Sequence, residues 1–124
     1  MFRWTKLGKA FTPQDVKGRD WLLEFAQAPA SLLFDDYLRI YFSCRPAADA
    51  NKQYVSYCAY VDLDRANPLN VVRVAEQPIL ELGALGTFDE FGTYPVSVIR
   101  DGDLVHAYYG GWTRCESGPF NVAI

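Results

Sequence analysis

Two arginines and a pair of adjacent carboxylates are the side chains whose type and setting best suit ligand chemistry. Arg45 and Arg114 each follow an apolar, strand-like segment, where a guanidinium could grip a carboxylate or phosphate or lie exposed at a rim. Asp89 and Glu90 lie in a glycine-rich loop, Gly83–Gly92. Carboxylates there could be the acids of a pocket, or they could stabilise the turn. These four residues are the candidate charged groups of a site.

Aromatic side chains are a second kind of candidate. Tyr94 and Trp112 could stack on the apolar face of a sugar ring, or they could fill the core between sheets. The single histidine, His106, lies among aromatic and aliphatic residues of a strand, where we expect it to be packed and hydrogen-bonded. Because no nucleophile motif such as GxSxG accompanies it, we expect no catalytic role for this histidine.

The three cysteines do not suggest a metal centre or a disulfide framework. Cys44, Cys58 and Cys115 are odd in number and widely spaced, and the chain has no CxxC motif. We therefore expect no metal, no other cofactor, and thiols that are buried in strands. Cys44 and Cys58 could face each other across a hairpin, although a reducing compartment disfavours a bridge between them.

Composition narrows the class of protein. Half of the 124 residues are apolar and 15% are aromatic, which argues against disorder and allows one modest domain. A net charge of −3 argues against nucleic-acid binding, and no apolar run approaches the roughly 20 residues of a membrane span. The basic N-terminal residues 1–10 lack a following apolar stretch of the kind that secretory signals have, so we expect a cytoplasmic protein.

The first half of the chain has the texture of consecutive strands. Ser31–Phe34 and Tyr37–Cys44 flank an Asp35-Asp36 turn, and Gln53–Asp62 and Leu69–Ala75 follow. Four strands joined by short connections form a β-meander, which is the unit of a propeller blade.

A second unit follows the glycine-rich loop. Tyr94–Arg100 and Asp103–Trp112 flank Asp101-Gly102, which we expect to form a type I′ hairpin turn. Phe120–Ile124 resembles the start of a third strand. Both units run in the order proline, apolar strand, acidic turn and aromatic strand, and Pro29 and Pro95 lie 66 residues apart.

The expected fold is therefore all-β, an antiparallel meander of about one and a half propeller blades in a single domain. Residues 1–28 are a lead-in, with a short helix near 12–15 and an extended segment from Trp21 to Gln27. Residues 29–82 form the first blade and 83–124 a partial second blade. A small β-sandwich or barrel, with an accidental repeat, is the alternative fold.

Three segments resemble five-bladed propeller glycosidases of glycoside hydrolase families 43 and 130. They are AQAPASLLFDDYLRIYFSCR (26–45), GTFDEFGTYPVSVI (86–99) and AYYGGW (107–112). The resemblance implies that the first strand of each blade lines a central funnel, and that Asp89 matches an acid of the family's FD motif. Hydrolysis needs two carboxylates, which in the family come from different blades. The expected first inner strand, residues 27–31, has none.

The resemblance implies a carbohydrate-binding or glycoside-hydrolase-like propeller fragment that is inactive as a lone chain, and it leaves open whether the chain is an enzyme. The alternative is a non-enzymatic, self-assembling β module. Unpaired strand edges, such as that of residues 120–124, favour pairing with other strands, so we expect a homo-oligomer. The expected partners are a carbohydrate ligand and further copies of the chain, with neither nucleic acid nor membrane.

Overall fold

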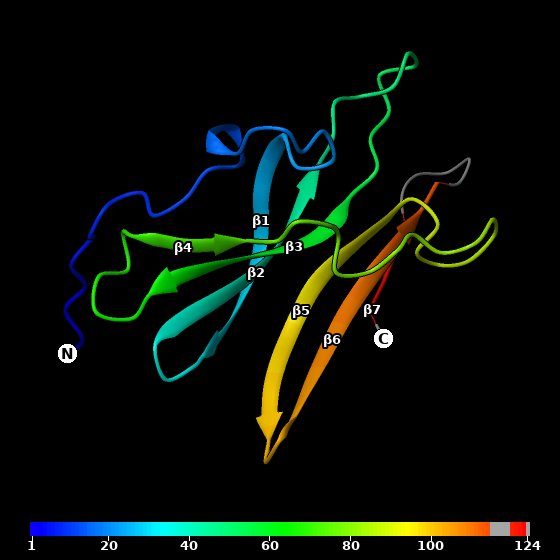
Figure 1. Ribbon diagram of the computed structural model, residues 1–124. Coiled ribbons are helices and arrows are strands. Elements are labelled where there is room, and N and C mark those ends of the chain that lie inside the picture. Colours follow the sequence, from blue (N-terminus) through cyan, green and yellow to red (C-terminus); the bar gives the residue numbers. More distant parts are fainter. Residues whose placement is uncertain (115–119, 124) are drawn as a thin grey trace.

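The computed structural model describes residues 1–114 and the backbone of 120–123, and it confirms an all-β, antiparallel meander (Figure 1). The described residues form two sheets and one short 3-10 turn. The first sheet has the order β1-β2-β3-β4 and the second β5-β6-β7. The elements are η1 (Pro13–Asp15), β1 (Glu24–Leu33), β2 (Tyr37–Arg45), β3 (Tyr57–Asp64), β4 (Val71–Val74), β5 (Gly92–Asp101), β6 (Leu104–Thr113) and β7 (Phe120–Ala123).

Strand β1 begins earlier than its sequence predicts. It starts at Glu24 rather than near Pro29, so the expected extended lead-in is part of the first sheet. Its pairing with β2 shifts register twice before Ala30, and Phe25 and Ala28 have positive φ angles of 63° and 49°. These irregularities interrupt the alternation of side chains along the strand, which is why no clear strand pattern marks its beginning.

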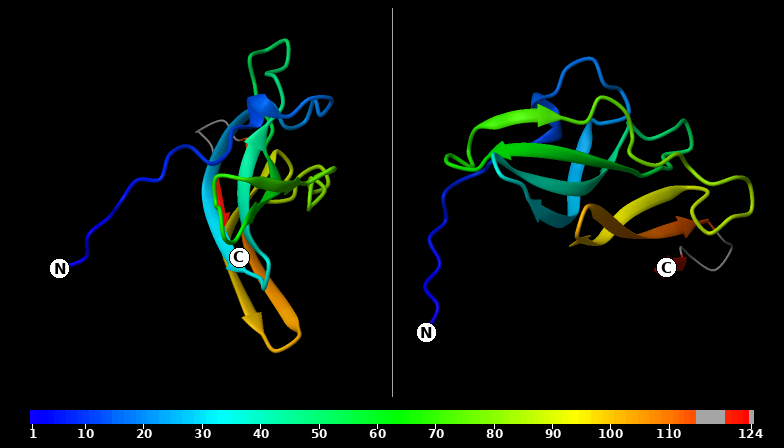
Figure 2. Two further views of the ribbon diagram at one scale, coloured as in Figure 1. Left: turned by 60° about the vertical axis from the view of Figure 1, so that its left-hand side comes forward. Right: turned by 60° about the horizontal axis from the view of Figure 1, so that its bottom comes forward.

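One face of the first sheet holds the main hydrophobic core. The N-terminal segment crosses this face, and the ring of Phe11 packs against that of Phe42 with centroids 5.3 Å apart. Residues 1–9 extend away from the sheets and are exposed (Figure 2). Burying the side chains of the core on this face is the main apolar contribution to the free energy of folding. The buried core residues are Leu22, Phe42, Cys44, Ala59, Val61, Leu63 and Ala75.

The opposite face carries a buried ion pair. Asp62 on β3 lies directly across from Arg39 on β2 and is 1% exposed. The Arg39 guanidinium donates two hydrogen bonds to this carboxylate, of 2.7 and 2.9 Å, and lies 3.9 Å from the ring centroid of Tyr60. The hydrogen bond to Asp62 raises the pKa of Arg39 above its ordinary value. Arg73 on the edge strand β4 approaches the same carboxylate at 4.0 Å.

The second sheet differs from expectation at its turn. Asp101 pairs with Leu104, so the two central residues of the turn are Gly102 and Asp103 rather than Asp101 and Gly102. Only Gly102 has a positive φ, of 58°, which is the type II′ pattern rather than the expected type I′. His106 on β6 is exposed, in contrast to the packed position that its apolar neighbours suggested.

The two sheets are stacked, with β1 and β5 in contact and starting at the same end of the molecule (Figures 1 and 2). Backbone bonds join them there, because the Ser56 amide donates to the Phe91 carbonyl and the Thr93 amide to the Ser56 carbonyl. The buried Thr93 hydroxyl accepts from the Cys58 amide at 3.2 Å. This junction fixes the relative position of the two first strands.

The described cysteines are free thiols. Ser43 lies opposite Cys58 and Cys44 opposite Tyr57, so the Cys44 and Cys58 side chains project from different faces and cannot be bridged. Cys115 lies outside the described residues. Burial raises the pKa of Cys44 to about 12 and that of Cys58 to about 11.

We expect both buried thiols to resist alkylation in the folded protein. At pH 8.5 almost no thiolate forms at either site, so iodoacetamide should react at least about a hundredfold more slowly there than in urea. Peptide mapping by mass spectrometry after timed labelling measures this at each cysteine. Fast labelling of either residue without denaturant would contradict the burial. Because the pKa values of both thiols are raised in the folded state, the stability that the buried neutral thiols contribute is fully present below about pH 9. It is lost as the pH rises through 11–12.

Candidate binding site

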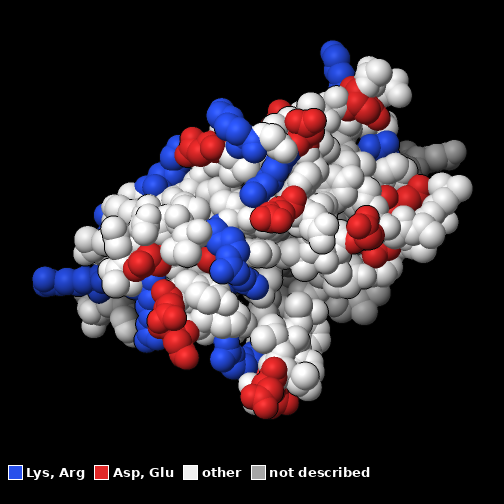
Figure 3. Space-filling model, in the orientation of Figure 1, with Lys and Arg blue, Asp and Glu red and all other residues white. Residues whose placement is uncertain are grey.

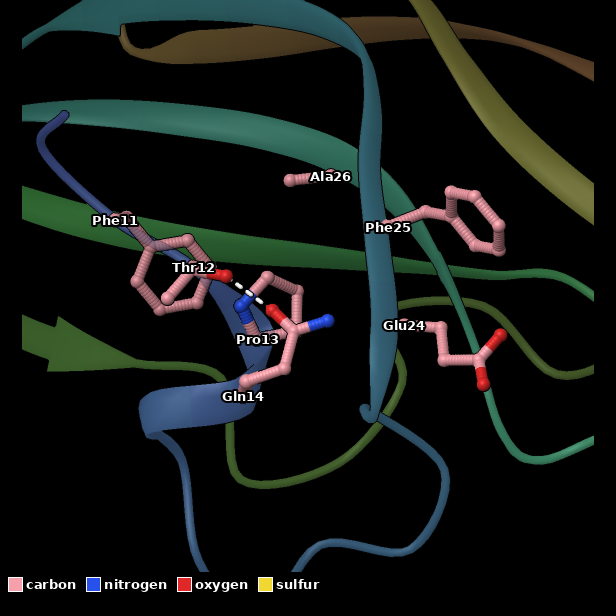
Figure 4. Close-up of a pocket in the computed structure, with 7 residues that line it drawn as sticks. All are labelled: Phe11, Thr12, Pro13, Gln14, Glu24, Phe25 and Ala26. Atoms are coloured by element: carbon pink, nitrogen blue, oxygen red, sulfur yellow. Dashed lines mark hydrogen bonds between the residues drawn. The ribbon is translucent and has the colours of Figure 1, made fainter.

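A pocket of about 370 Å³ lies between the start of β1 and the segment around η1 (Figure 4). Pro13 begins η1, a first-turn position where its missing N–H costs no hydrogen bond, and its side chain is buried. The Thr12 hydroxyl donates to the side-chain oxygen of Gln14 across the pocket wall. The pocket is open to solvent and has both polar and aromatic walls. Its lining residues are Phe11, Thr12, Pro13, Gln14, Glu24, Phe25 and Ala26.

Glu24 and Phe25 project from the same side of β1, although they are neighbours in a strand (Figure 4). The positive φ of Phe25 interrupts the usual alternation. Glu24 is therefore an acidic residue at the start of the first strand. This corrects the expectation that the first inner strand has no carboxylate, which rested on a strand starting at residue 27. Glu24 lies directly across from Arg45 of β2.

Arg45 lies between two aromatic rings at this end of the sheet, within cation–π distance of both. Its guanidinium carbon lies 5.2 Å from the ring centroid of Phe25 and 5.2 Å from that of Tyr54. The two rings pack edge to face with centroids 6.5 Å apart. Phe25 thus belongs both to the pocket wall and to the support of Arg45.

Arg114 continues this arrangement into the second sheet. Its guanidinium donates a 2.7 Å hydrogen bond to the Tyr54 carbonyl and lies 4.1 Å from the Phe91 ring centroid. Rings and guanidiniums therefore alternate across the junction of the two sheets. We call Phe25, Arg45, Tyr54, Arg114 and Phe91 the arginine–aromatic row.

The two guanidiniums of the row have no carboxylate partner among the described residues. The ion pairs within 4.0 Å in this part of the chain all involve Asp62. The Nε atom of Arg45 is buried and has no hydrogen-bond partner there. An unpaired buried donor is costly, and more so on a charged group. Arg45 is thus held by packing on the two rings, and its Nε donor is unused among the described residues.

The candidate acids Asp89 and Glu90 bind groups of their own loop and, for Asp89, of the neighbouring strand β6. Asp89 accepts from the Thr87 hydroxyl at 2.8 Å and from the Tyr109 hydroxyl at 3.1 Å, and Glu90 accepts from the Gly86 amide at 2.9 Å. Burial, followed by the bond to Asp89, raises the pKa of Tyr109. These contacts match the turn-stabilising alternative, and both carboxylates remain half-buried in the loop that carries Phe91.

The candidate aromatic residues Tyr94 and Trp112 cover glycines. Tyr94 lies over Gly110 and Trp112 over Gly92, each directly across the β5–β6 ladder, where a Cβ atom would collide with the ring. Trp112 also packs on Phe91 with centroids 6.2 Å apart, so it adjoins the row. The structure therefore brings together Arg45, Arg114 and Trp112, with Tyr94 on the same face as Trp112.

Sequence reasoning missed Glu24, Phe25, Tyr54 and Phe91. The segment WLLEFAQ fits a helix or a strand equally well, so nothing placed Glu24 in a site. The available signal is an aromatic residue in each loop that precedes a central strand, Tyr54 before β3 and Phe91 before β5. That signal is weak, because aromatic residues are frequent throughout the chain.

Other classes of site are not evident in the described part of the chain. No group of three or more His, Cys, Asp or Glu residues there is close enough to hold a metal ion. None of its helices is long and apolar enough to cross a membrane. On the face shown in Figure 3, acidic and basic side chains are interspersed.

The chain resembles two uncharacterized proteins of Mycobacterium tuberculosis, one from strain CDC 1551 / Oshkosh and one from strain ATCC 25618 / H37Rv. Each is 34% identical over 122 residues, which are 98% of this chain and 38% of the relative. The chain thus spans under two fifths of the length of these relatives, which are about 320 residues long on these figures. No family model matches the chain, and no solved structure gives a significant match.

Proposed function

We propose that the chain forms about one and a half blades of a cytoplasmic β-propeller and binds a carbohydrate where β1 and β5 begin. The observation that carries this proposal is the arginine–aromatic row, which spans both units beside an open pocket. Ligand sites are typically concave, with aromatic walls and a few polar groups that fix orientation. The pocket and the row supply both.

Corresponding strands of the two sheets support a repeat. β1 begins at Glu24 and β5 at Gly92, 68 residues later, while β2 at Tyr37 and β6 at Leu104 are 67 apart. Relatives of about 320 residues have room for about five units of this size. This agrees with the five blades that the glycosidase resemblance implies.

The chemistry of the site suits a sugar. Aromatic faces such as that of Phe25 can pack on the apolar side of a pyranose, and guanidinium donors can bind its oxygens. Glu24 lies in the pocket wall and can accept hydrogen bonds from hydroxyls. Hydrolysis would need a second carboxylate in place. We therefore propose binding, with catalysis requiring groups from additional units of a longer protein.

A glycan array followed by calorimetric titration tests this proposal. We expect the Phe25→Ala and Tyr54→Ala variants to lose at least about tenfold in affinity for any bound glycan, because each removes a ring of the row. Tyr108→Ala is the matched control, since this ring is 51% exposed on the outer face of β6. Absence of glycan binding, or equal binding by all three variants, would overturn the proposal.

Self-assembly is a second candidate, favoured by one observation. The outer face of β5 and β6, turned away from the first sheet, exposes Ile99, Leu104 and Tyr108 by 53%, 64% and 51%. Exposed apolar sheet faces commonly mark interaction surfaces. Light scattering that gives a monomer at high concentration would contradict assembly of this chain with itself.

A further inference from the structure

We infer that the ligand of this site carries an anionic group, a carboxylate or a phosphate on the sugar, and that Arg45 and Arg114 bind it. This inference rests on the proposed carbohydrate binding and specifies its substrate class. It begins from a contrast between arginines within the same protein.

Arg39 shows how this fold satisfies a buried arginine. It lies over the ring of Tyr60 and donates two hydrogen bonds to Asp62. Arg45 has the same kind of aromatic support, from Phe25 and Tyr54, but no described carboxylate takes the place of Asp62. The anion that would complete the arrangement is therefore missing from the described residues.

The acidic side chains nearby do not compensate the two guanidiniums. Glu24 lies opposite Arg45 on the neighbouring strand, yet no ion pair within 4.0 Å joins these two described residues. Asp89 and Glu90 already accept hydrogen bonds from donors of their own loop and, for Asp89, from the Tyr109 hydroxyl of β6. Among the residues that the structure describes, no ion pair thus neutralises these two positive charges, in a chain whose net charge is −3.

The geometry suits a planar or tetrahedral oxyanion. A guanidinium that stacks on a ring keeps its N–H groups in its own plane, where they can form a bidentate contact with carboxylate or phosphate. Arg114 uses one Nη2 bond for the Tyr54 carbonyl, which fixes its position and leaves further donors. Arg45 contacts the ring of Tyr54 and Arg114 its backbone carbonyl, so both guanidiniums lie next to one residue. In this proposal one anionic substituent binds there while the sugar ring lies in the pocket beside Phe25.

Titration with three related monosaccharides tests the inference. D-glucuronate, D-glucose 6-phosphate and D-glucose are added to the full chain, and binding is followed by calorimetry and by the ¹⁵N–¹H resonance of Arg45 Nε. We expect a charged sugar to bind at least about tenfold more tightly than glucose, with this advantage falling as salt rises. Preference for glucuronate or for glucose 6-phosphate distinguishes a carboxylate from a phosphate.

Variants separate the charge contact from a structural role. Arg45→Gln and Arg114→Gln should remove the advantage of the charged sugar, so that the ratio of its affinity to that of glucose falls to about one. Arg100→Gln is the matched control, because Arg100 also stacks on a ring, that of Phe34 at 4.8 Å, away from the site. Urea unfolding of each variant identifies any loss of folding, and Arg45→Lys, which keeps the charge without the fork, should restore part of the advantage.

The outcomes distinguish this inference from the proposed function. Equal binding of glucose and the charged sugars would overturn the anionic ligand and leave carbohydrate binding intact. Inorganic phosphate that binds as tightly as glucose 6-phosphate would overturn the sugar as ligand. Binding of no monosaccharide, or full retention of the charge preference in Arg45→Gln, would overturn the inference itself.

Discussion

Replacing Asp62 with asparagine is expected to destabilise the folded chain by about 3 kcal/mol, because removing one member of a buried ion pair leaves the other charge without a partner. The Asp62 side chain is 1% exposed and accepts both hydrogen bonds of the Arg39 guanidinium, whereas Arg39 is 18% exposed. The partial exposure of Arg39 places the expected cost at the lower end of the range for such pairs. Urea unfolding followed by fluorescence gives the change in midpoint at constant slope.

Two further variants serve as controls for Asp62→Asn. Asp36→Asn removes an exposed carboxylate in the turn between β1 and β2 and should change stability by less than about 0.5 kcal/mol. The double variant Arg39→Met, Asp62→Leu replaces the pair by apolar side chains and should recover most of the loss. A single Asp62→Asn variant as stable as the wild type would show that Asp62 is not the buried partner of Arg39.

Replacing Gly111 with alanine is expected to destabilise the chain by about 2 kcal/mol, the usual cost of adding a methyl group to a filled space. A Cβ atom at this position would lie 2.6 Å from the Cβ of Asp89 and 2.6 Å from the Phe88 ring. Because the Asp89 contact is close to the backbone, the whole loop must move rather than one side-chain tip. The Tyr109–Asp89 hydrogen bond of 3.1 Å should weaken as the loop moves.

The loss of that hydrogen bond has its own readout. The pKa of Tyr109 is raised in the folded protein, so in the variant it should fall toward its ordinary value in a spectroscopic tyrosine titration. In the wild type, the stability linked to the raised pKa of Tyr109 is fully present below about pH 10. It is lost as the pH rises through the higher pKa of the folded state. Ser97→Ala, on the same hairpin, is the control and should leave both measurements unchanged. An unaffected Tyr109 in Gly111→Ala would contradict the packing of the loop on β6.

Much of the fold can be predicted from the sequence because its runs of β-branched and aromatic residues are bounded by turn-forming residues. The Tyr37–Cys44 run and the Asp35-Asp36 turn lie within one residue of the observed strand end and hairpin. The start of β1 is not readable, since positive φ at Phe25 and Ala28 and two register shifts erase the period of two. The sequence predicts the hairpin of the second sheet, but its turn lies one residue further along, at Gly102-Asp103. An Asp-Gly pair favours a type I′ turn without excluding a turn that begins at the glycine.

The charged residues of the candidate site are easier to select from the sequence than the aromatic residues that they contact. Arg45 and Arg114 were identified from their positions after strands, and both prove to contact Tyr54. Tyr54 itself carries no local signal, because its role depends on two segments that are 60 residues apart in the chain. The Arg39–Asp62 pair was missed for a similar reason, since β2 and β3 must be aligned before their charges can be matched.

The junction at Ser56, Gly92 and Thr93 limits how this protein can be divided. The Thr93 hydroxyl and backbone complete hydrogen bonds of the first sheet, at Cys58 and Ser56, although Thr93 belongs to the second. A gene cut between the two repeats would expose those buried groups on both halves. The two sheets are therefore coupled at this junction, and neither is expected to be exchanged or expressed alone without exposing polar groups that are now buried.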